Sequence, residues 1–210
     1  MEFAIEPVLP EDAPRITELY FSAFTNSLSQ RIMPRTKESE AFQTANFRKS
    51  AEEAQSGQGK DMIKIVATVP DQEPVIAGFA LWNFYSGTSD SNEHKRENVE
   101  WPSSSDRELC ERFFSGVERE RQTAIGDQPH YCLQLLAVDP AFGRRGLGAK
   151  LLKWGLDRAD EKRLITFISA SPAGRGLYEK HGCRALNNYE VVPGYHETSM
   201  VRPVAGLSRG

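Results

Sequence analysis

The chain has 210 residues, of which 39% are hydrophobic and 26% are charged, and its formal net charge is −3 at pH 7. This length and composition predict a single soluble domain with a sizeable core, rather than a disordered chain. The slightly negative charge argues against a protein that coats nucleic acid or an anionic membrane.

No segment predicts export or membrane insertion. The N-terminus has no basic leader, and an apolar run such as Val75–Trp82 is far shorter than the ~20 residues of a spanning helix. The three cysteines and four histidines lack the spacing of disulfide frameworks or metal sites. We therefore expect a cytoplasmic monomer or homodimer with reduced thiols, no metal, no nucleic-acid partner and no membrane partner.

The first part of the chain predicts one strand, two helices and a hairpin. Phe3–Val8 is β-prone, and Asp12 is suited to cap an amphipathic helix that follows it. A more polar helix is expected between Lys37 and Gln55. The runs Met62–Val69 and Val75–Tyr85, joined by a turn that contains Pro and Asp, predict an antiparallel hairpin.

A polar segment, 86–128, separates this hairpin from the next strand. It contains a helix candidate in which Leu109, Phe113 and Val117 share one face. We interpret the segment as a polar and helical insertion within a single domain that spans residues 1–210. The favoured role of its helix is to pack on the main domain, and a lid over a substrate is the alternative.

The stretch Tyr131–Val138 is almost continuously apolar, which predicts a central strand covered on both faces. After a glycine-rich loop at 143–148, the pattern changes to helical spacing. Ala149, Leu152 and Leu156 then lie on one stripe of a helix. The order is therefore strand, glycine loop, helix.

The remaining chain predicts one more strand and helix and a final pair of strands. Leu164–Ala170 is β-prone, Ser171 is suited to cap the helix that follows, and Gly182 is suited to end it. The last two β-prone segments lie near Tyr189–Val192 and Thr198–Val201.

A glycine loop that opens a helix predicts an anion site, because the first helical N–H groups are unpaired and the helix N-terminus is positive. A P-loop would need Gly before Lys150 and Ser or Thr after it, but Ala149 and Leu151 stand there. A dinucleotide loop would need a third glycine after Gly146 and Gly148, and an acid on the next strand. Both nucleotide motifs are therefore incomplete.

The segment GRRGLGAKLL resembles the acyl-CoA pyrophosphate loop of the GNAT N-acyltransferase superfamily, which usually reads Gln/Arg-x-x-Gly-x-Gly/Ala. Arg145, Gly146, Leu147 and Gly148 match the second half of that pattern. Gly143 stands where the family usually has Gln or Arg, so this side-chain contact is missing. Seven basic and three acidic residues between Phe142 and Arg163 favour an anionic ligand as well.

A second motif downstream supports the resemblance. LITFISASPAGRGLYEKHGC is similar to the later strand and helix of the family. The positions that match directly are Leu177, Tyr178, Glu179, Lys180 and Gly182, whereas Ser171, Gly174 and Cys183 replace the usual Asn, Ala and Phe. The resemblance covers residues 62–201. The sequence is similar to a subset of the family that we associate with filamentous fungi.

The resemblance implies an α+β fold in which helices flank a mixed, mostly antiparallel sheet. It also implies an enzyme that transfers the acetyl group of acetyl-CoA to an amine by direct attack. Tyr178 corresponds to the tyrosine that commonly protonates the departing sulfur. The residues expected to bind coenzyme A are Leu136, Ala137, Val138, Gly143, Arg144, Arg145, Gly146, Leu147, Gly148, Ala149, Ser171 and Gly174.

The general base and the acceptor site are less well indicated. The central strand contains no acid, only Gln134, so the candidates for the base are His130, Glu190 and His196. An amine of low pKa would need no base. Aromatic side chains that could line an acceptor site are Tyr20, Phe24, Phe42, Phe47, Trp82, Tyr85 and Tyr195.

Two other interpretations stay open. Because Gly143 and the missing strand acid depart from the family pattern, the chain could be a protein that binds acyl-CoA without efficient chemistry. A nucleotide-binding loop is the third interpretation, and it would have to bind without the usual residues.

Overall fold

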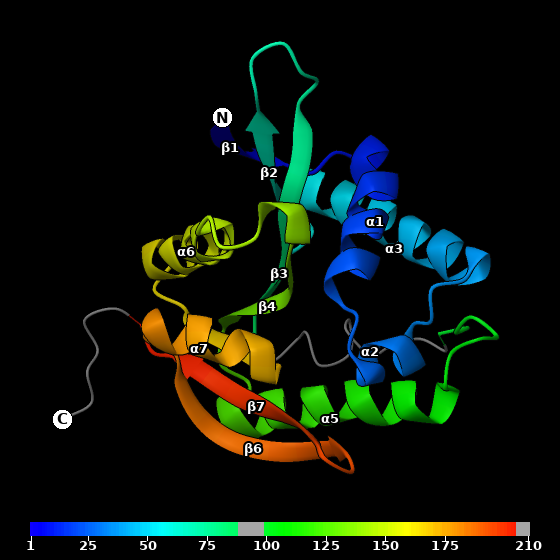
Figure 1. The fold of residues 1–210 in the computed structure, drawn as a ribbon. Coiled ribbons are helices and arrows are strands. Elements are labelled where there is room, and N and C mark those ends of the chain that lie inside the picture. The colour runs from blue at the N-terminus through cyan, green and yellow to red at the C-terminus, as the bar shows by residue number, and fades with distance from the viewer. Residues whose placement is uncertain (88–98, 205–210) are drawn as a thin grey trace.

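The computed structural model describes residues 1–87 and 99–204, and a seven-stranded sheet runs through its centre (Figure 1). The strand order is β1-β2-β3-β4-β5-β7-β6. Every neighbouring pair is antiparallel except β4 and β5, which are parallel. The strands are β1 (Glu2–Pro7), β2 (Lys60–Thr68), β3 (Val75–Tyr85), β4 (His130–Val138), β5 (Ile165–Ala170), β6 (Arg184–Val192) and β7 (Tyr195–Arg202).

Helices cover both faces of the sheet. Helices α1, α3 and α5 pack on one face, and α6 and α7 pack on the other (Figure 1). The short α2 lies against α5. The helices are α1 (Ala13–Ala23), α2 (Ser27–Ile32), α3 (Lys37–Gln55), α5 (Arg107–Ile125), α6 (Leu147–Glu161) and α7 (Pro172–Lys180), with 3-10 turns at Pro10–Asp12 and Pro140–Phe142. None of the helices in the described ranges is long and apolar enough to cross a bilayer.

Local capping explains where several helices begin. The Thr36 hydroxyl accepts a hydrogen bond from the backbone N–H of Ser39 at 3.2 Å, at the start of α3. Asp106 accepts from the N–H of Leu109 at 3.1 Å, at the start of α5. These side chains satisfy N–H groups that have no partner inside the helix. The predicted helix between Lys37 and Gln55 is confirmed at both ends.

Asp12 takes the N-cap position of α1, as predicted, but its side chain does not cap that helix. Its carboxylate accepts from the backbone N–H of Leu9 at 2.8 Å and from the Lys64 ammonium at 2.6 Å, and it makes no cap bond to α1. Asp12 therefore closes the preceding 3-10 turn and pairs with a buried cation of β2, Lys64. The helix α2, only six residues long, was not predicted.

Helix α5, which belongs to the predicted insertion, packs on the sheet. Its residue Ile125 joins Tyr85, Cys132 and Phe167 in one buried cluster, and Val117 lies at the border of that cluster. In the same half of the helix, the Glu120 carboxylate accepts from Asn187 of β6 at 3.0 Å. Residues 88–98 of the predicted insertion lie outside the described residues.

The core on the α6 face is built around a stacked pair of rings. Trp82 and Tyr131 lie nearly parallel, 8° apart, with ring centroids separated by 5.0 Å. The Tyr131 hydroxyl donates to Asp61 at the rim of this core. Gly155 of α6 lies directly against Trp82, because a Cβ at this position would be only 2.1 Å from the indole ring.

We predict that Gly155→Ala lowers the free energy of unfolding by about 1–3 kcal/mol, because the added methyl group forces Trp82 out of its position. The matched control is Gly176→Ala in α7, where a Cβ meets no atom within 4 Å. This control should leave stability unchanged or raise it by less than about 1 kcal/mol. Urea denaturation of both variants measures the difference. Equal stabilities would contradict the close contact between α6 and the indole ring.

Candidate active site

The central strands β4 and β5 diverge in the middle of the sheet. Their parallel pairing ends at Leu133 and Ile168, although both strands continue. Beyond that point, the residues of β4 from Leu135 to Val138 pair only with β3. We call this place the divergence point. It leaves one edge of β4 without a neighbouring strand, so its backbone groups are available to a ligand.

A bulge in β4 accompanies the divergence. Leu81 of β3 pairs with Leu135 and Trp82 pairs with Leu133, so Gln134 is an extra residue with no partner in β3. A bulge of this kind bends a strand and interrupts its ladder. Gln134 is exposed. The predicted site residues Leu136, Ala137 and Val138 follow directly after the bulge, on the part of β4 that has left β5.

The loop that follows β4 presents a row of unpaired backbone N–H groups. Over the described residues, none of the N–H groups of residues 144–149 donates a hydrogen bond. The first bond of α6 is made by Lys150, whose N–H donates to the Gly146 carbonyl at 3.1 Å. Since residues 143–146 are exposed, these N–H groups form a site for an anion at the positive end of a 15-residue helix.

Two residues of this loop adopt left-handed backbone conformations. Gly146 has a φ of 74° and Arg144 has a φ of 59°. A positive φ is unusual for a residue with a side chain, so the backbone at Arg144 is strained. Such strain often marks a functional loop. By contrast, the φ of Gly143 is −57°, so its conformation does not require glycine.

The glycine at 148 allows α6 to lie close to its neighbours. A Cβ at this position would be 3.5 Å from Leu177 of α7 and 3.6 Å from Leu136 of β4. Leu147 is buried in the core, so only its backbone can reach a ligand, and Ala149 is half-buried. The structure therefore brings the loop residues 143–149 next to the free edge of β4.

Tyr178 lies over the first turn of α7. The Ser171 hydroxyl caps this helix by accepting from the N–H of Gly174 at 3.3 Å. A Cβ on Gly174 would be 3.0 Å from the Tyr178 ring and 3.2 Å from its hydroxyl. The tyrosine is 8% exposed. Its hydroxyl makes no hydrogen bond to any residue in the described ranges.

The ionisation of Tyr178 is shifted by its surroundings. Burial raises its pKa above the usual tyrosine value, and the nearby negative charge of Glu197 raises it further. The phenol therefore stays protonated at neutral pH and is suited to donate a proton rather than to accept one.

Glu197 of β7 is a site residue that the sequence analysis missed. Its side chain is 5% exposed and accepts hydrogen bonds from Ser169 and Tyr195, both at 3.1 Å. Tyr189 lies 2.9 Å from the Ser169 hydroxyl. Burial raises the pKa of Glu197, and that effect outweighs both hydrogen bonds. The alternation of Tyr195, Glu197 and Ser199 along one face of β7 is the signal that could have found it.

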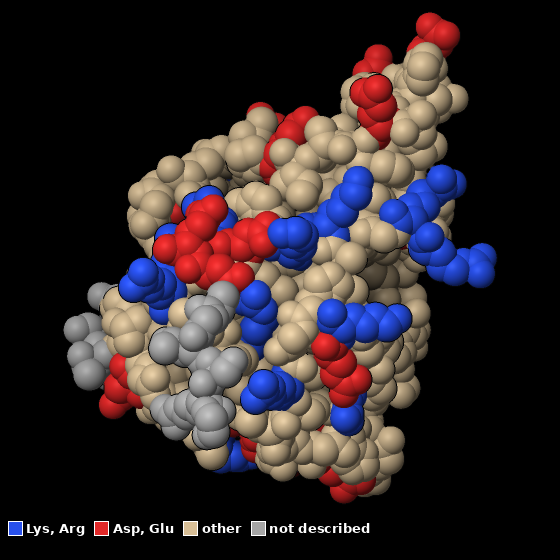
Figure 2. Space-filling view, turned by 90° about the vertical axis from the view of Figure 1, so that its left-hand side faces the viewer, with Lys and Arg blue, Asp and Glu red and all other residues tan. Residues whose placement is uncertain are grey.

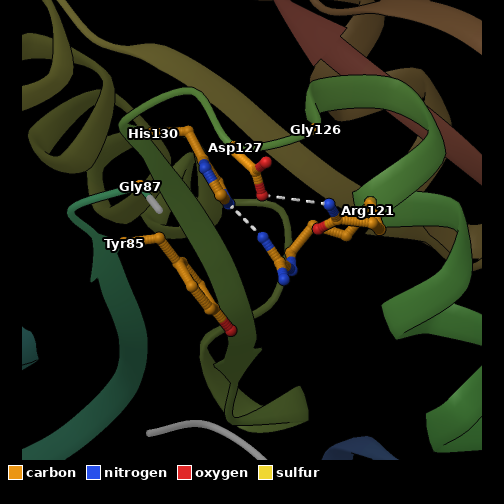
Figure 3. A pocket seen from close by; sticks show the side chains of 7 residues that line it. Tyr85, Gly87, Arg121, Gly126, Asp127 and His130 are labelled. Carbon is orange, nitrogen blue, oxygen red and sulfur yellow. Dashed lines mark hydrogen bonds between the residues drawn. The ribbon is translucent and has the colours of Figure 1, made fainter. Parts of the chain in front are cut away.

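The predicted bases occupy other places. His130 is 1% exposed and stacks on Tyr85 at the far end of β4, where its two ring nitrogens contact Arg121 at 2.9 Å and the Gln128 carbonyl at 2.7 Å (Figure 3). The neighbouring cavity of about 10 Å³ has room for only one water molecule. His130 therefore has a structural role.

Glu190 and His196 lie in the exposed part of the β6–β7 hairpin. The Glu190 carboxylate accepts from the N–H of Gly194 at 2.8 Å, which stabilises the turn. Neither residue is buried with Tyr178.

The aromatic candidates lie in three places. Phe47, Trp82 and Tyr85 are buried in the core. Tyr20 and Tyr195, together with Phe42, are partly buried around the cluster that joins α2, α5 and the β6–β7 hairpin. Phe24 lies at the border of the core beneath α1.

The surface beside α6 and α7 carries both signs of charge, with Lys and Arg side chains gathered along its right-hand side in Figure 2. Lys153 pairs with Asp157 at 2.6 Å, and Arg158 lies 3.4 Å from Asp61. Arg144 and Arg145 are exposed and form no ion pair within the described part of the chain. These two cations lie in the anion loop itself.

Other surfaces offer less chemistry. A broad depression at the β1–β2–β3 end contains charges that already have partners, such as Asp12 with Lys64 and Arg15 with Asp139. All three cysteines are free and buried. No group of three or more His, Cys, Asp or Glu residues in the described ranges has the arrangement of a metal site.

Comparison with known proteins agrees with this geometry. The family model described as acetyltransferase (GNAT) domain matches residues 113–183, and no curated protein matches the sequence. The chain is similar to the structure of agmatine N-acetyltransferase, with a TM-score of 0.69 and 12% identity, covering 96% of this chain and 99% of that one.

Two further structures are similar over nearly the whole chain. Mosquito arylalkylamine N-acetyltransferase like 5b has a TM-score of 0.65 and 13% identity, with 96% and 99% of the two chains covered. PaiA N-acetyltransferase from Thermoplasma acidophilum, in complex with coenzyme A, has a TM-score of 0.57 and 11% identity, with 97% and 99% covered. The chain therefore has the GNAT fold. Residues 113–183 match the acetyltransferase (GNAT) domain model, in agreement with the resemblance of the sequence.

We predict that the Glu197 carboxyl makes stability depend on pH. Because its pKa is raised on folding, the folded state holds this proton more tightly than the unfolded chain does. Its contribution to the free energy of unfolding therefore falls as the pH rises from the unfolded pKa through the raised folded pKa.

Glu197→Gln has no proton to lose. Relative to the wild type, it should gain stability as the pH rises from the unfolded pKa, about 4.3, through the raised folded pKa. Urea denaturation at several pH values measures this difference. Parallel stability profiles of the two proteins would contradict a raised pKa at this position.

Proposed function

We propose that the protein is an acetyl-CoA-dependent N-acetyltransferase that transfers the acetyl group to a primary amine by direct attack on the thioester. The observation that carries this proposal is the row of unpaired N–H groups at residues 144–149, next to the free edge of β4. The first feature suits a diphosphate, and the second suits an extended chain that carries amide groups. Coenzyme A combines both.

The residues present fit this cosubstrate. The loop N–H groups, with Arg144 and Arg145, would bind the diphosphate. The backbone of Leu136, Ala137 and Val138 would hydrogen-bond the pantetheine arm, which would lie along β4 as a strand does. Names of similar proteins agree with amine acceptors, since two of them are an agmatine and an arylalkylamine N-acetyltransferase.

The chemistry requires stabilisation of an oxyanion and a proton for the departing thiolate. Backbone N–H groups on the free edge of β4 would polarise the thioester carbonyl, and one well-placed donor is worth about 3 kcal/mol. Tyr178 would give its phenolic proton to the sulfur. Its raised pKa keeps that proton in place until the C–S bond breaks.

One observation favours a second function, that of a protein which binds acyl-CoA with little catalysis. Gly143 provides no side chain at a position where relatives of the superfamily usually carry Gln or Arg. Thiol release from acetyl-CoA, measured with a panel of primary amines, separates the two functions. An enzyme accelerates release with at least one amine, whereas a binding protein shows only background hydrolysis.

We predict that Gly146→Asp weakens acetyl-CoA binding at least tenfold, or about 1.4 kcal/mol. The position tolerates the change because a Cβ there meets no atom within 4 Å, and because Asp and Asn accept left-handed backbone more readily than other residues. The new carboxylate would cap α6 and repel the diphosphate.

The matched control for this substitution is Gly146→Asn, which has the same shape without the charge. It should lose less affinity, and both variants should unfold within about 1 kcal/mol of each other. Titration calorimetry with acetyl-CoA measures the affinities. Wild-type affinity in the Asp variant would show that the loop does not bind the diphosphate.

We predict that Tyr178→Phe lowers kcat by about 10²–10⁴-fold while acetyl-CoA affinity stays within threefold of the wild type. The phenyl ring preserves the packing against Gly174 but has no proton to donate. Tyr85→Phe is the control, because it removes a buried hydroxyl far from the divergence point and should leave kcat unchanged. Unchanged turnover in Tyr178→Phe would exclude this residue as the acid.

A further inference from the structure

Glu197 is the only buried Asp or Glu among the described residues. A buried carboxylate ordinarily has a cationic partner, because an unpaired charge inside a protein is costly. Over the described ranges, no Lys, Arg or His forms an ion pair with Glu197. Its hydrogen-bond donors are the neutral hydroxyls of Ser169 and Tyr195. The side chain therefore lacks a cation.

Glu197 lies next to the point where β4 and β5 diverge. Its donor Ser169 is the first residue of β5 beyond Ile168, where pairing with β4 ends. Glu197 itself lies one residue beyond Thr198, the last partner of β5 in β7. The carboxylate is thus held at the divergence point, on the side of β5 opposite the free edge of β4, and close enough to Tyr178 to raise its pKa.

We propose that Glu197 binds the ammonium group of the acceptor and takes its proton before the attack on the thioester. This inference rests on the proposed function. It makes Glu197 a catalytic residue and the acceptor a small cationic primary amine. The charge missing beside Glu197 is then supplied by the substrate itself.

The surroundings of Glu197 restrict the class of acceptor further. The tip of the β6–β7 hairpin packs against α2 and α5, with Val191 buried and Tyr189 and Tyr195 partly buried in the same cluster as Phe21. The Tyr189 ring also lies against Gly116 of α5. These contacts provide aromatic and aliphatic surface beside the Glu197 carboxylate. They suit one positive charge on an apolar stem.

Other titratable groups facing Glu197 are phenols. Tyr189 comes from β6, Tyr195 from β7 itself and Tyr178 from α7, and burial raises the pKa of each of them, that of Tyr189 to about 12. From α5, the charges of Glu120 and Arg119 act on Tyr189. The phenols therefore stay protonated at neutral pH, and Glu197 is the buried carboxyl of this cluster.

The proton balance of the reaction is as follows. The Glu197 carboxylate takes one proton from R–NH₃⁺, and the lone pair of the resulting amine forms the C–N bond to the thioester carbonyl. When the adduct collapses, the C–S bond breaks and its electron pair stays on sulfur, which receives the proton of Tyr178. The second proton of the nitrogen restores Tyr178, and Glu197 releases its proton to water. The products are the amide, the thiol and one proton.

The test compares the wild type with Glu197→Gln in thiol-release assays between pH 6 and 9. The probes are n-butylamine, 2-phenylethylamine and 1,4-diaminobutane, each paired with an analogue carrying fluorine at the β carbon. Fluorine lowers the pKa of the amine, so more of it is already neutral at pH 7. The matched control is Glu190→Gln, which keeps an oxygen for the hydrogen bond from Gly194 in the same hairpin.

For ordinary amines at pH 7, kcat/KM of Glu197→Gln should fall by about 10²-fold or more. With the fluorinated analogues the loss should shrink at least tenfold, because a larger fraction of those amines is already neutral and needs no base. Glu190→Gln should stay within twofold of the wild type. The acetyl-CoA affinity of all three proteins, measured by calorimetry, should agree within threefold.

Two outcomes would overturn the inference while leaving cosubstrate binding intact. One is a loss in Glu197→Gln that is absent or equal for both members of each amine pair. The other is a wild type that binds acetyl-CoA but acetylates none of the amines. A wild type that does not bind acetyl-CoA would instead overturn the proposed function itself.

Discussion

The end of pairing between β4 and β5 is the constraint on which the rest of the site depends. A continuous ladder would satisfy every backbone group of both strands and leave nothing for a ligand. Here the bulge at Gln134 and the last pair, Leu133 with Ile168, release one edge of β4 in the middle of the sheet. The sheet stays intact because β3 still pairs with β4 and β7 still pairs with β5. An interior strand thus has a free edge without the molecule having lost its core.

Three features gather around that point, and each carries a local cost to stability. The loop at 144–149 leaves N–H groups unpaired and holds Arg144 in a left-handed conformation. The Tyr178 hydroxyl has no hydrogen-bond partner in the described residues, and Glu197 buries a carboxyl without a cation. A ligand would supply what each group lacks: acceptors for the N–H groups, a hydrogen-bond partner for the phenol and a cation for the carboxyl. Their convergence is the physical argument for a site that binds an anion on one side and an amine on the other.

The sequence predicted local structure well where the signals were local. The helix between Lys37 and Gln55 has a capping threonine before it and a glycine region after it, and both ends were found. The helix after Ser171 was found for the same reason. The six-residue α2 was missed because so short a helix contains less than two turns of periodic pattern. Asp12 takes the predicted N-cap position of α1, but its carboxylate is engaged by Leu9 and by Lys64, which lies on a strand 52 residues away.

By itself, the sequence determined the strand, glycine loop and helix of the anion site, the capped helix that carries Tyr178, and the class of fold. These features depend on residues within a few positions of one another, so propensity and motif spacing reveal them. Only the tertiary structure decided where β4 leaves β5, that His130 is a core residue, and that Glu197 is buried where its charge acts on Tyr178. Each of these outcomes depends on the register between strands that are distant in the chain. A shift of one residue in that register would turn Glu197 to the opposite face of the sheet.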